Sequence, residues 1–155
     1  MNCRFLDWQI EVKGPLGAIY LDTYNIKSIH SPLKVNPYII TYNTLLQNAI
    51  DGVGYGFIMK LKLRGSGYKV LSLQEDRLVL RMGYSHLCNI IIPYNIKVVF
   101  HKSGQILCQG ISKSKLTQFG TDLKKIRKRS PYRAKGIFEV GEALPNKLPG
   151  KAGRK

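Results

Sequence analysis

A dense run of basic residues near the carboxyl end offers the strongest candidate chemistry in this chain. Seven of the twelve residues from Lys124 to Lys135 are Lys or Arg, and none is acidic. The run begins on an amphipathic pattern, crosses Pro131 and continues through Tyr132 and Gly136. Lys binds phosphate as a point charge, Arg binds it as a planar bidentate donor, and an aromatic ring stacks on a base. The combination predicts a surface for a polyphosphate backbone rather than a solvated helix face.

The whole chain shares this positive character. Its 155 residues include 25 Lys and Arg against 9 Asp and Glu, which gives a net charge of +16. Residues 113–155 hold thirteen of these cations and only three of the acids. A polyanionic partner relieves the self-repulsion of such a protein and releases counterions. Because 44% of the residues are apolar, the chain can also bury a core. We therefore predict a folded protein whose partner is nucleic acid, with no cofactor.

Further cations lie outside this run. Lys60, Lys62 and Arg64 fall on one face of a predicted strand, where a solvated face fits the pattern as well as RNA contact does. A basic tail over 145–155 is too polar to pack alone. The predicted RNA-binding residues are Lys60, Lys62, Arg64, Lys69, Lys124, Lys125, Arg127, Lys128, Arg129, Tyr132, Arg133, Lys135, Gly136, Lys147, Lys151, Arg154 and Lys155.

Metal and catalytic chemistry have little support in the sequence. His86 and Cys88 would face the same side of a strand, but a metal site needs about four ligands and the others are not specified. Ser85 and His86 are adjacent, so on a strand they point to opposite faces and cannot act as nucleophile and base. The nine carboxylates form no obvious catalytic pair. We predict neither a metal site nor an enzyme.

The cysteines and the amino terminus bear on location. Cys3, Cys88 and Cys108 are odd in number and widely spaced, which predicts buried free thiols in a reducing compartment. No apolar run approaches the roughly 20 residues that span a bilayer. Asp7 and Glu11 near the start are atypical of a secretory signal or an Arg-rich presequence. A protein of an organelle is then expected to be made there or to have lost its presequence.

The hydrophobic pattern of the first third predicts two strands and a helix. Apolar residues alternate with polar ones over 6–13, which predicts a strand with one buried face, and a second strand is predicted over 18–22. Apolar residues at helical spacing predict a helix over 43–53, capped by Thr41 or Asn43.

The rest of the chain repeats the plan of strands followed by a helix. Strands are predicted over 57–64, 68–73, 77–82, 88–92, 96–101 and 105–109. A second helix is predicted to start after Ser112 and to end at Ser130, because Pro131 disfavours a helical conformation there. The fold class is therefore α+β, with two halves of similar plan. We predict domains at 1–55 and 56–144, followed by the basic tail at 145–155.

Five segments, taken in order, resemble one protein family. They are VKGPLG at 12–17, LLQNAIDGV at 45–53, GSGYK at 65–69, LVLRMGYSH at 78–86 and PYRAKGI at 131–137. These resemble that family's VKGPKG, LLxNMxxGV, GVGYR, LVLxxGYSHP and PYKGKGI. The family is the universal L-six group of large-subunit ribosomal proteins, and the segments span nearly the whole chain.

The resemblance implies a structural protein that binds ribosomal RNA near the sarcin–ricin loop and the stalk base, where translation factors dock. It also implies two similar small α+β domains, each an antiparallel sheet packed on one helix, and neighbouring large-subunit proteins as partners. Contact by the carboxyl-terminal domain points to Tyr132, Arg133, Lys135 and Gly136, with the tail beside them. The chain departs from the family at Ala134, and at Leu87, and its opening hairpin is shortened.

Two questions stay open at this stage. The chain is rich in Ile, Lys, Asn and Tyr, which suits an AT-rich organellar genome and favours a mitochondrial ribosome over a plastid or bacterial one. An RNA-processing enzyme or an accessory RNA-binding protein is the alternative function. A peripheral membrane protein is a third reading, although Gly120 and a narrow apolar stripe make the second helix better suited to a core.

Overall fold

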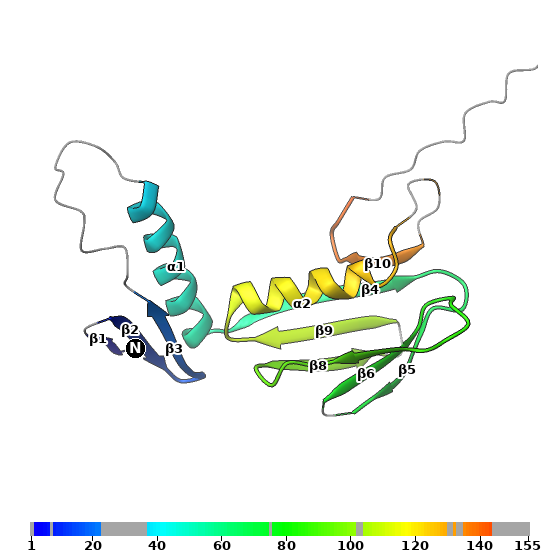
Figure 1. Cartoon of the computed structure of the whole chain (residues 1–155), viewed down its shortest axis with the longest axis horizontal. Helices are drawn as coiled ribbons and strands as arrows, with labels where there is room; N and C mark the ends of the chain where they lie inside the picture. The colour runs from blue at the N-terminus through cyan, green and yellow to red at the C-terminus, as the bar shows by residue number, and fades with distance from the viewer. Residues whose placement is uncertain are drawn as a thin grey trace, which may run out of the picture. The chain divides into compact units, whose positions relative to one another are not determined.

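The computed structural model describes residues 2–6, 8–22, 37–74, 76–101, 104–129, 132 and 135–143, which form two compact units. The first unit is Met1–Phe57 with Gly110–Leu116, and the second is Ile58–Gln109 with Thr117–Lys155. Antiparallel sheets and two helices make up the fold, so the predicted α+β class is confirmed (Figure 1). Among these residues, no helix has the length and apolar character needed to cross a membrane. The domains predicted at 1–55 and 56–144 stay a prediction.

The first unit is a three-stranded sheet with one helix packed on it. Its elements are β1 (Asn2–Phe5), β2 (Gln9–Gly14), β3 (Gly17–Asp22) and α1 (Pro37–Gly54). The strands are antiparallel in the order β1-β2-β3. The core forms where Ile10 and Val12 of β2 meet Ala49 and Val53 of α1. Gly14 lies so close to this helix that an added Cβ would overlap the Val53 side chain.

The predicted strand over 6–13 is wrong at its start. Leu6 and Gln9 exchange backbone hydrogen bonds of 2.8 and 3.3 Å, which close a turn between β1 and β2. Leu6 and Trp8 are consequently exposed, although their spacing placed them on the buried face. Glu11, expected to face solvent, is buried instead, with its carboxylate accepting a hydrogen bond from Tyr20 Oη at 2.9 Å.

Helix α1 begins at Pro37, six residues before the predicted start. Proline suits the first turn of a helix, where its missing N–H has no partner within the helix. Thr41 and Asn43 therefore lie inside α1, and the prediction that one of them caps it is wrong. The helix ends at Gly54, as expected, and the following Gly56 has a φ of +74°.

Two sheets and one helix build most of the second unit. Its elements are β4 (Phe57–Arg64, from Ile58 onward), β5 (Lys69–Leu73), β6 (Arg77–Arg81), β7 (Cys88–Ile91), β8 (Ile96–His101), β9 (Gln105–Gly110, up to Gln109), α2 (Lys113–Lys125, from Thr117 onward) and β10 (Gly136–Glu139). One sheet has the order β10-β4-β9-β8 and the other the order β5-β6-β7. The strands predicted from alternation are confirmed to within a residue or two. On β4, Leu61 and Leu63 are buried while Lys60 and Arg64 are exposed, as the pattern predicted.

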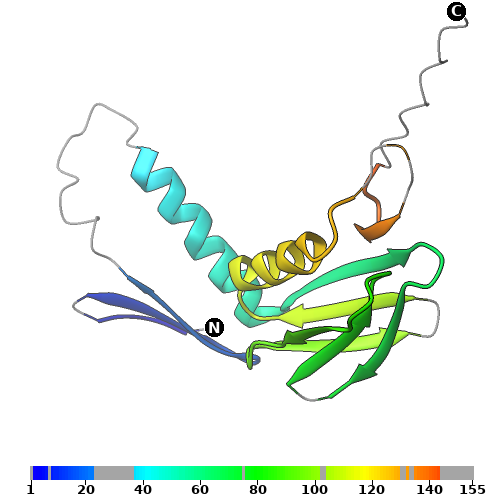
Figure 2. The ribbon, with the colours of Figure 1, turned by 45° about the vertical axis from the view of Figure 1, so that its right-hand side comes forward.

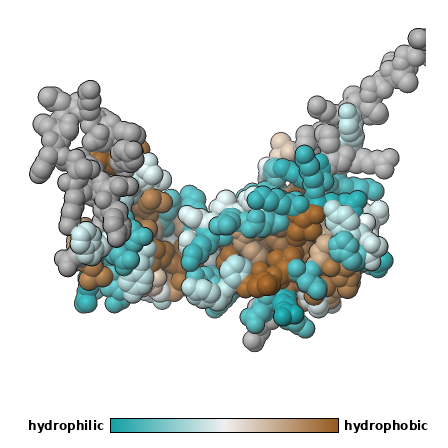
Figure 3. Space-filling model, viewed as in Figure 1, coloured by the Kyte–Doolittle hydropathy of each residue, from teal (hydrophilic) through white to brown (hydrophobic). Residues whose placement is uncertain are grey.

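From Thr117 onward, α2 covers one face of the sheet that contains β4 and β9 (Figure 2). Phe119 and Leu123 of the helix are buried. Gly120 fits directly against Met59 of β4, where an added Cβ would overlap the Met59 sulfur. In Figure 3, hydrophilic residues line the outer side of α2, and apolar residues gather beneath it over the strands. Gly120 therefore allows the helix to pack closely on the sheet, which is the core role expected for this helix.

The end predicted for the second helix, Ser130, is wrong, because α2 stops at Lys125. Tyr84, in the turn between β6 and β7, donates a hydrogen bond from its Oη to the Ile126 carbonyl at 3.2 Å. A helix continued to Ser130 would direct that carbonyl along the helix axis. The first residue after α2 is thus hydrogen-bonded to a residue far away in sequence, and the helix has ended before Pro131.

Strand β10 was not predicted. It pairs antiparallel with β4, so that Ile137 lies opposite Leu63. Its four residues follow directly on the basic run, and their charge context favoured a binding segment over a strand. Only pairing with a distant strand gives this segment its structure, since a four-residue strand has little stability of its own.

The three cysteines differ in burial. Cys108 is buried, and burial raises the pKa of its thiol to about 11, so it remains protonated and unreactive. Cys88 is half-buried. Cys3 is exposed on β1, so the prediction of a buried thiol is wrong for this residue.

Candidate nucleic-acid interface

Lys124 and Arg129 of the basic run form ion pairs with carboxylates at or near the end of β10. Lys124 Nζ lies 3.0 Å from Glu139 Oε2 and 3.3 Å from Glu142 Oε2. Arg129 forms a second ion pair with Glu142. Both carboxylates lie at or just beyond the end of β10, which β4 holds in place. Pairing of β10 with β4 therefore brings two acids to the basic run.

These contacts favour the ionised form of Glu142. Partial burial opposes ionisation, but hydrogen bonds from Arg129, from the Glu139 backbone and from Lys124 outweigh it. Together they hold the pKa of Glu142 below its usual value of 4.5. The carboxylate is therefore charged at neutral pH and is committed to the two cations.

Arg127 is enclosed by the protein in a different way. Its Cζ lies 5.6 Å from the centroid of the Tyr68 ring and 4.8 Å from that of Tyr84. Its Nη1 donates a 2.6 Å hydrogen bond to the Met82 carbonyl. At Gly83, whose φ is +72°, an added Cβ would come within 2.9 Å of the same nitrogen. We call Lys124, Arg127 and Arg129 the paired cations.

The contacts of Arg127 join the basic run to two of the segments that define the resemblance. Tyr68 belongs to the GSGYK segment, and Tyr84 to LVLRMGYSH. Arg127 itself comes from the basic run that leads into PYRAKGI. The basic run is distant in sequence from both segments, and the structure brings all three stretches together around one guanidinium group.

The remaining residues of the run are more accessible. Lys125 forms an exposed ion pair with Asp122 at 3.3 Å. Lys128 and Lys135 are exposed and make no ion pair with any described residue. Tyr132 is 60% exposed. Gly136 is buried at the start of β10. The predicted residues outside the described part of the chain are Arg133, Lys147, Lys151, Arg154 and Lys155.

The cations of β4 lie beside β10. Arg64 is opposite Gly136, and Lys62 is opposite Phe138. Lys60 and Arg64 are exposed, whereas Lys62 is half-buried. This row therefore continues the basic surface from the run onto the sheet, by way of the exposed Lys135 just before β10.

A third set of cations was partly missed by sequence reasoning. Lys69 of β5 lies opposite Arg81 of β6. Arg77, at the other end of β6, lies on the same face of the sheet as Arg81. All three are exposed, and none forms an ion pair within the described chain. Only Lys69 was predicted. The signal for the other two was the alternation Arg77-Leu78-Val79-Leu80-Arg81, in which fully buried leucines leave both arginines on the opposite face. We call Lys69, Arg77 and Arg81 the outer cation row.

The residues considered for catalysis or metal binding have other surroundings. The His86 ring stacks on Tyr84, with centroids 5.4 Å apart and planes inclined by 12°. Within the described chain, no group of three or more His, Cys, Asp or Glu is placed to hold a metal ion. The described residues of this surface offer cations and exposed aromatic rings.

Comparison with known proteins gives concordant matches. The chain is 37% identical over 161 residues to the large ribosomal subunit protein uL6 of Mycoplasma pneumoniae, covering 95% of this chain and 87% of that protein. It is 34% identical to uL6 of Mycoplasmoides gallisepticum, covering 89% and 82%. It is also 35% identical to uL6m of Reclinomonas americana, covering 88% and 84%. No family model matches the chain.

Proposed function

The chain belongs to the uL6 family of large ribosomal subunit proteins, and we propose that it binds large-subunit rRNA near the sarcin–ricin loop and the stalk base. The family is structural rather than enzymatic, so the chain is a structural constituent of the large subunit. The observation that carries the proposal is similarity to several uL6 proteins over most of the chain. The net charge of +16 supports an RNA partner.

We propose a division of labour among the cations. Exposed cations without a protein partner, such as Lys128, Lys135 and Lys60, neutralise phosphates. The paired cations instead fix the backbone of the segment that carries Lys128 and Lys135, because their charges are already satisfied. Most RNA contacts of this kind read backbone and shape, since A-form RNA hides its major groove. Arg133 and the tail cations belong to the same proposed surface.

The outer cation row is part of this proposal. Lys69, Arg77 and Arg81 lie on one face of the sheet, and the buried leucines of β6 lie on the other. The three cations are therefore accessible to a phosphate backbone. Positions fixed on a sheet suit recognition by shape, because the spacing between the charges does not change on binding.

We propose a mitochondrial ribosome as the location, with translation factors and large-subunit proteins nearby. The composition, rich in Ile, Lys, Asn and Tyr, supports an organellar genome. A relative from Reclinomonas americana named uL6m supports the same choice. The chain is also similar to uL6 proteins of bacteria and to a uL6c of Guillardia theta. Bacterial and plastid ribosomes are therefore the alternative locations that an experiment must distinguish.

Sedimentation tests the assignment to a ribosome and its compartment. Mitochondria, plastids where present, and cytosol are separated, and each lysate is run on a sucrose gradient. The chain is expected to sediment with the large subunit of the mitochondrial fraction and to shift to the top after ribonuclease treatment. Recovery with another compartment's ribosomes would contradict the mitochondrial proposal, and recovery away from all rRNA would contradict the proposed function.

Footprinting tests the rRNA region. Hydroxyl radicals are applied to large-subunit rRNA with and without the purified chain. Protection is expected at the sarcin–ricin loop and the stalk base. Protection confined to another region would contradict this part of the proposal.

A further inference from the structure

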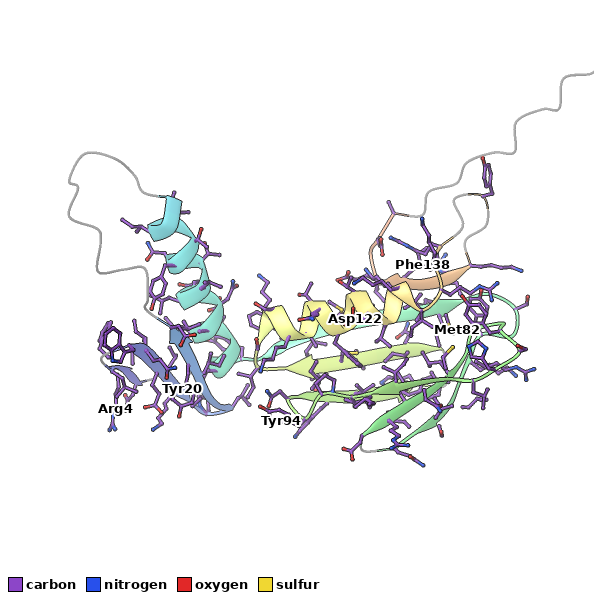
Figure 4. The ribbon with its side chains drawn as sticks, viewed as in Figure 1. Arg4, Tyr20, Met82, Tyr94, Asp122 and Phe138 are labelled. Atoms are coloured by element: carbon purple, nitrogen blue, oxygen red, sulfur yellow. The ribbon has the colours of Figure 1, made fainter. Side chains whose placement is uncertain are left out.

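Tyr84 and His86 form an exposed stacked pair in the turn between β6 and β7. Their ring centroids lie 5.4 Å apart with an interplanar angle of 12°. Tyr84 is 40% exposed, and His86 is also exposed. Figure 4 labels Met82, the residue at which the chain leaves β6 and enters this turn.

The Tyr84 half of the pair is held from several sides. Its hydroxyl donates to the Ile126 carbonyl at 3.2 Å, and Arg127 lies over its ring with Cζ at 4.8 Å from the centroid. Arg127 is in turn fixed by its hydrogen bond to Met82. The turn passes through Gly83 at a φ of +72°, a backbone conformation that residues with a side chain rarely adopt. The ring is therefore oriented before any ligand arrives.

Packing within the protein explains Tyr84 but not His86. Tyr84 closes the contact between the turn and the segment after α2. His86 adds an exposed planar ring to Tyr84, and its side chain makes no hydrogen bond or ion pair with the described residues. It also belongs to no metal-binding group among them. An exposed aromatic ring on a rigid support is the kind of surface on which a planar ligand stacks at low entropic cost.

We propose that the Tyr84–His86 pair stacks an unpaired base of large-subunit rRNA on the exposed ring of His86. This inference rests on the proposed function and adds a base contact to a surface otherwise built from charges. Proteins recognise single-stranded RNA by stacking splayed bases on aromatic rings, His included. The surroundings favour RNA over a protein, because Arg127 touches the pair and the exposed Lys128 follows it in the chain.

The test compares His86→Ala with His86→Phe, using His101→Ala as the matched control. His101 is also an exposed histidine, at the end of β8. Affinity of the full chain for large-subunit rRNA is measured by filter binding between about 0.05 and 0.3 M salt. His86→Ala is expected to weaken binding by about 5- to 150-fold, the equivalent of ~1–3 kcal/mol for one stacked base. The salt slope should stay unchanged, because stacking neutralises no phosphate.

The variants separate stacking from other roles of the histidine. His86→Phe keeps a flat ring without the imidazole nitrogens and should bind like the unmodified chain, as should His101→Ala. Melting temperatures of all three variants should match, because both side chains are exposed. Weak binding by His86→Phe, or a shallower salt slope for His86→Ala, would overturn stacking as the role of His86.

Two further outcomes separate this inference from the function on which it rests. If the unmodified chain binds rRNA and His86→Ala binds equally well, the inference alone is overturned. If His86→Ala binds rRNA normally but enters the large subunit poorly, the pair contacts a protein and the inference is again overturned. If the unmodified chain binds no rRNA, the proposed function fails and the inference fails with it.

Discussion

The paired cations and the outer cation row present charge in opposite ways. The paired cations come from the most basic stretch of the chain, yet each is bound by a carboxylate, a carbonyl or an aromatic ring of the protein. The outer cation row is sparse in sequence, yet its three members are exposed and make no ion pair within the described chain. Charge density along a sequence therefore does not measure the charge offered to a ligand.

The scarcity of acids explains why the comparison comes out this way. Residues 113–155 contain only Asp122, Glu139 and Glu142 as acids, and all three are in ion pairs with the basic run. Close like charges repel unless they are screened or paired, so a dense run recruits the counter-charges within reach. The outer cation row has no counter-charge among the described residues, although Lys69 and Arg81 lie opposite each other, and its cations remain accessible.

The largest expected effect comes from Arg127→Ala. The change removes a cation from two aromatic rings and leaves the Met82 carbonyl without its donor. We expect a loss of about 2–3 kcal/mol in the free energy of unfolding, measured by urea denaturation. Lys128→Ala, the adjacent exposed cation, should change stability by less than about 0.5 kcal/mol. Equal stabilities of the two variants would remove the basis for calling Arg127 a paired cation.

The outer cation row predicts the reverse: a change in binding with little change in stability. Lys69→Gln, Arg77→Gln and Arg81→Gln, combined, should lower the salt slope of rRNA binding by about 2–3 in a filter-binding titration, because each lost phosphate contact removes ~0.9 or less. Each substitution should alter stability by less than about 0.5 kcal/mol. The control is Lys124→Gln with Arg129→Gln, which should lower stability while changing the slope less. A larger slope change in the control would reverse the comparison.

A pH series sharpens the assignment of the paired cations. Because the folded-state pKa of Glu142 is below 4.5, its ion pairs stabilise the fold above that pH and are lost as pH falls through the folded-state value. Glu142→Gln should lower stability at pH 7 by about 1 kcal/mol. The difference from the unmodified chain, measured by urea denaturation at pH 7 and in the acid range, should shrink toward low pH. A difference that does not depend on pH would mean that Glu142 acts by packing.

The smallest effect is expected at the exposed ion pair of α2. Lys125 and Asp122 have side chains that are 72% and 55% exposed, so solvent screens their attraction. Lys125→Gln should change the free energy of unfolding, measured by urea denaturation, by no more than Lys128→Gln does, to within about 0.5 kcal/mol. A loss comparable to that of Arg127→Ala would show that exposure does not separate the two groups of cations.

Much of the fold was accessible from sequence because its signals are local. Alternation on β4, and the glycine that ends α1, were correct because neighbouring residues decide them. The start of α1 at Pro37 was missed because the helical spacing of apolar residues placed it only at 43, although proline also suits a first helical turn. Strand β10 was missed because four residues carry too little pattern to reveal a partner strand far away.

The candidate site was accessible only in part. The sequence identified where cations are frequent, and it named Lys69 from the row on β5 and β6. It did not separate Lys128 from Arg127, two adjacent basic residues with different surroundings. It also missed Arg77 and Arg81, because two isolated arginines attract less attention than a run.

By itself, the sequence determined the family, the α+β class and the positive charge, because motif order, hydrophobic periodicity and composition are properties of the chain. The tertiary structure decided which cations are used internally and which face outward. Arg127 meets Met82 across 45 positions of sequence, and Lys124 meets Glu139 only because β10 pairs with β4. Contacts across such separations form when the chain closes large loops around a common core, and no local pattern specifies them.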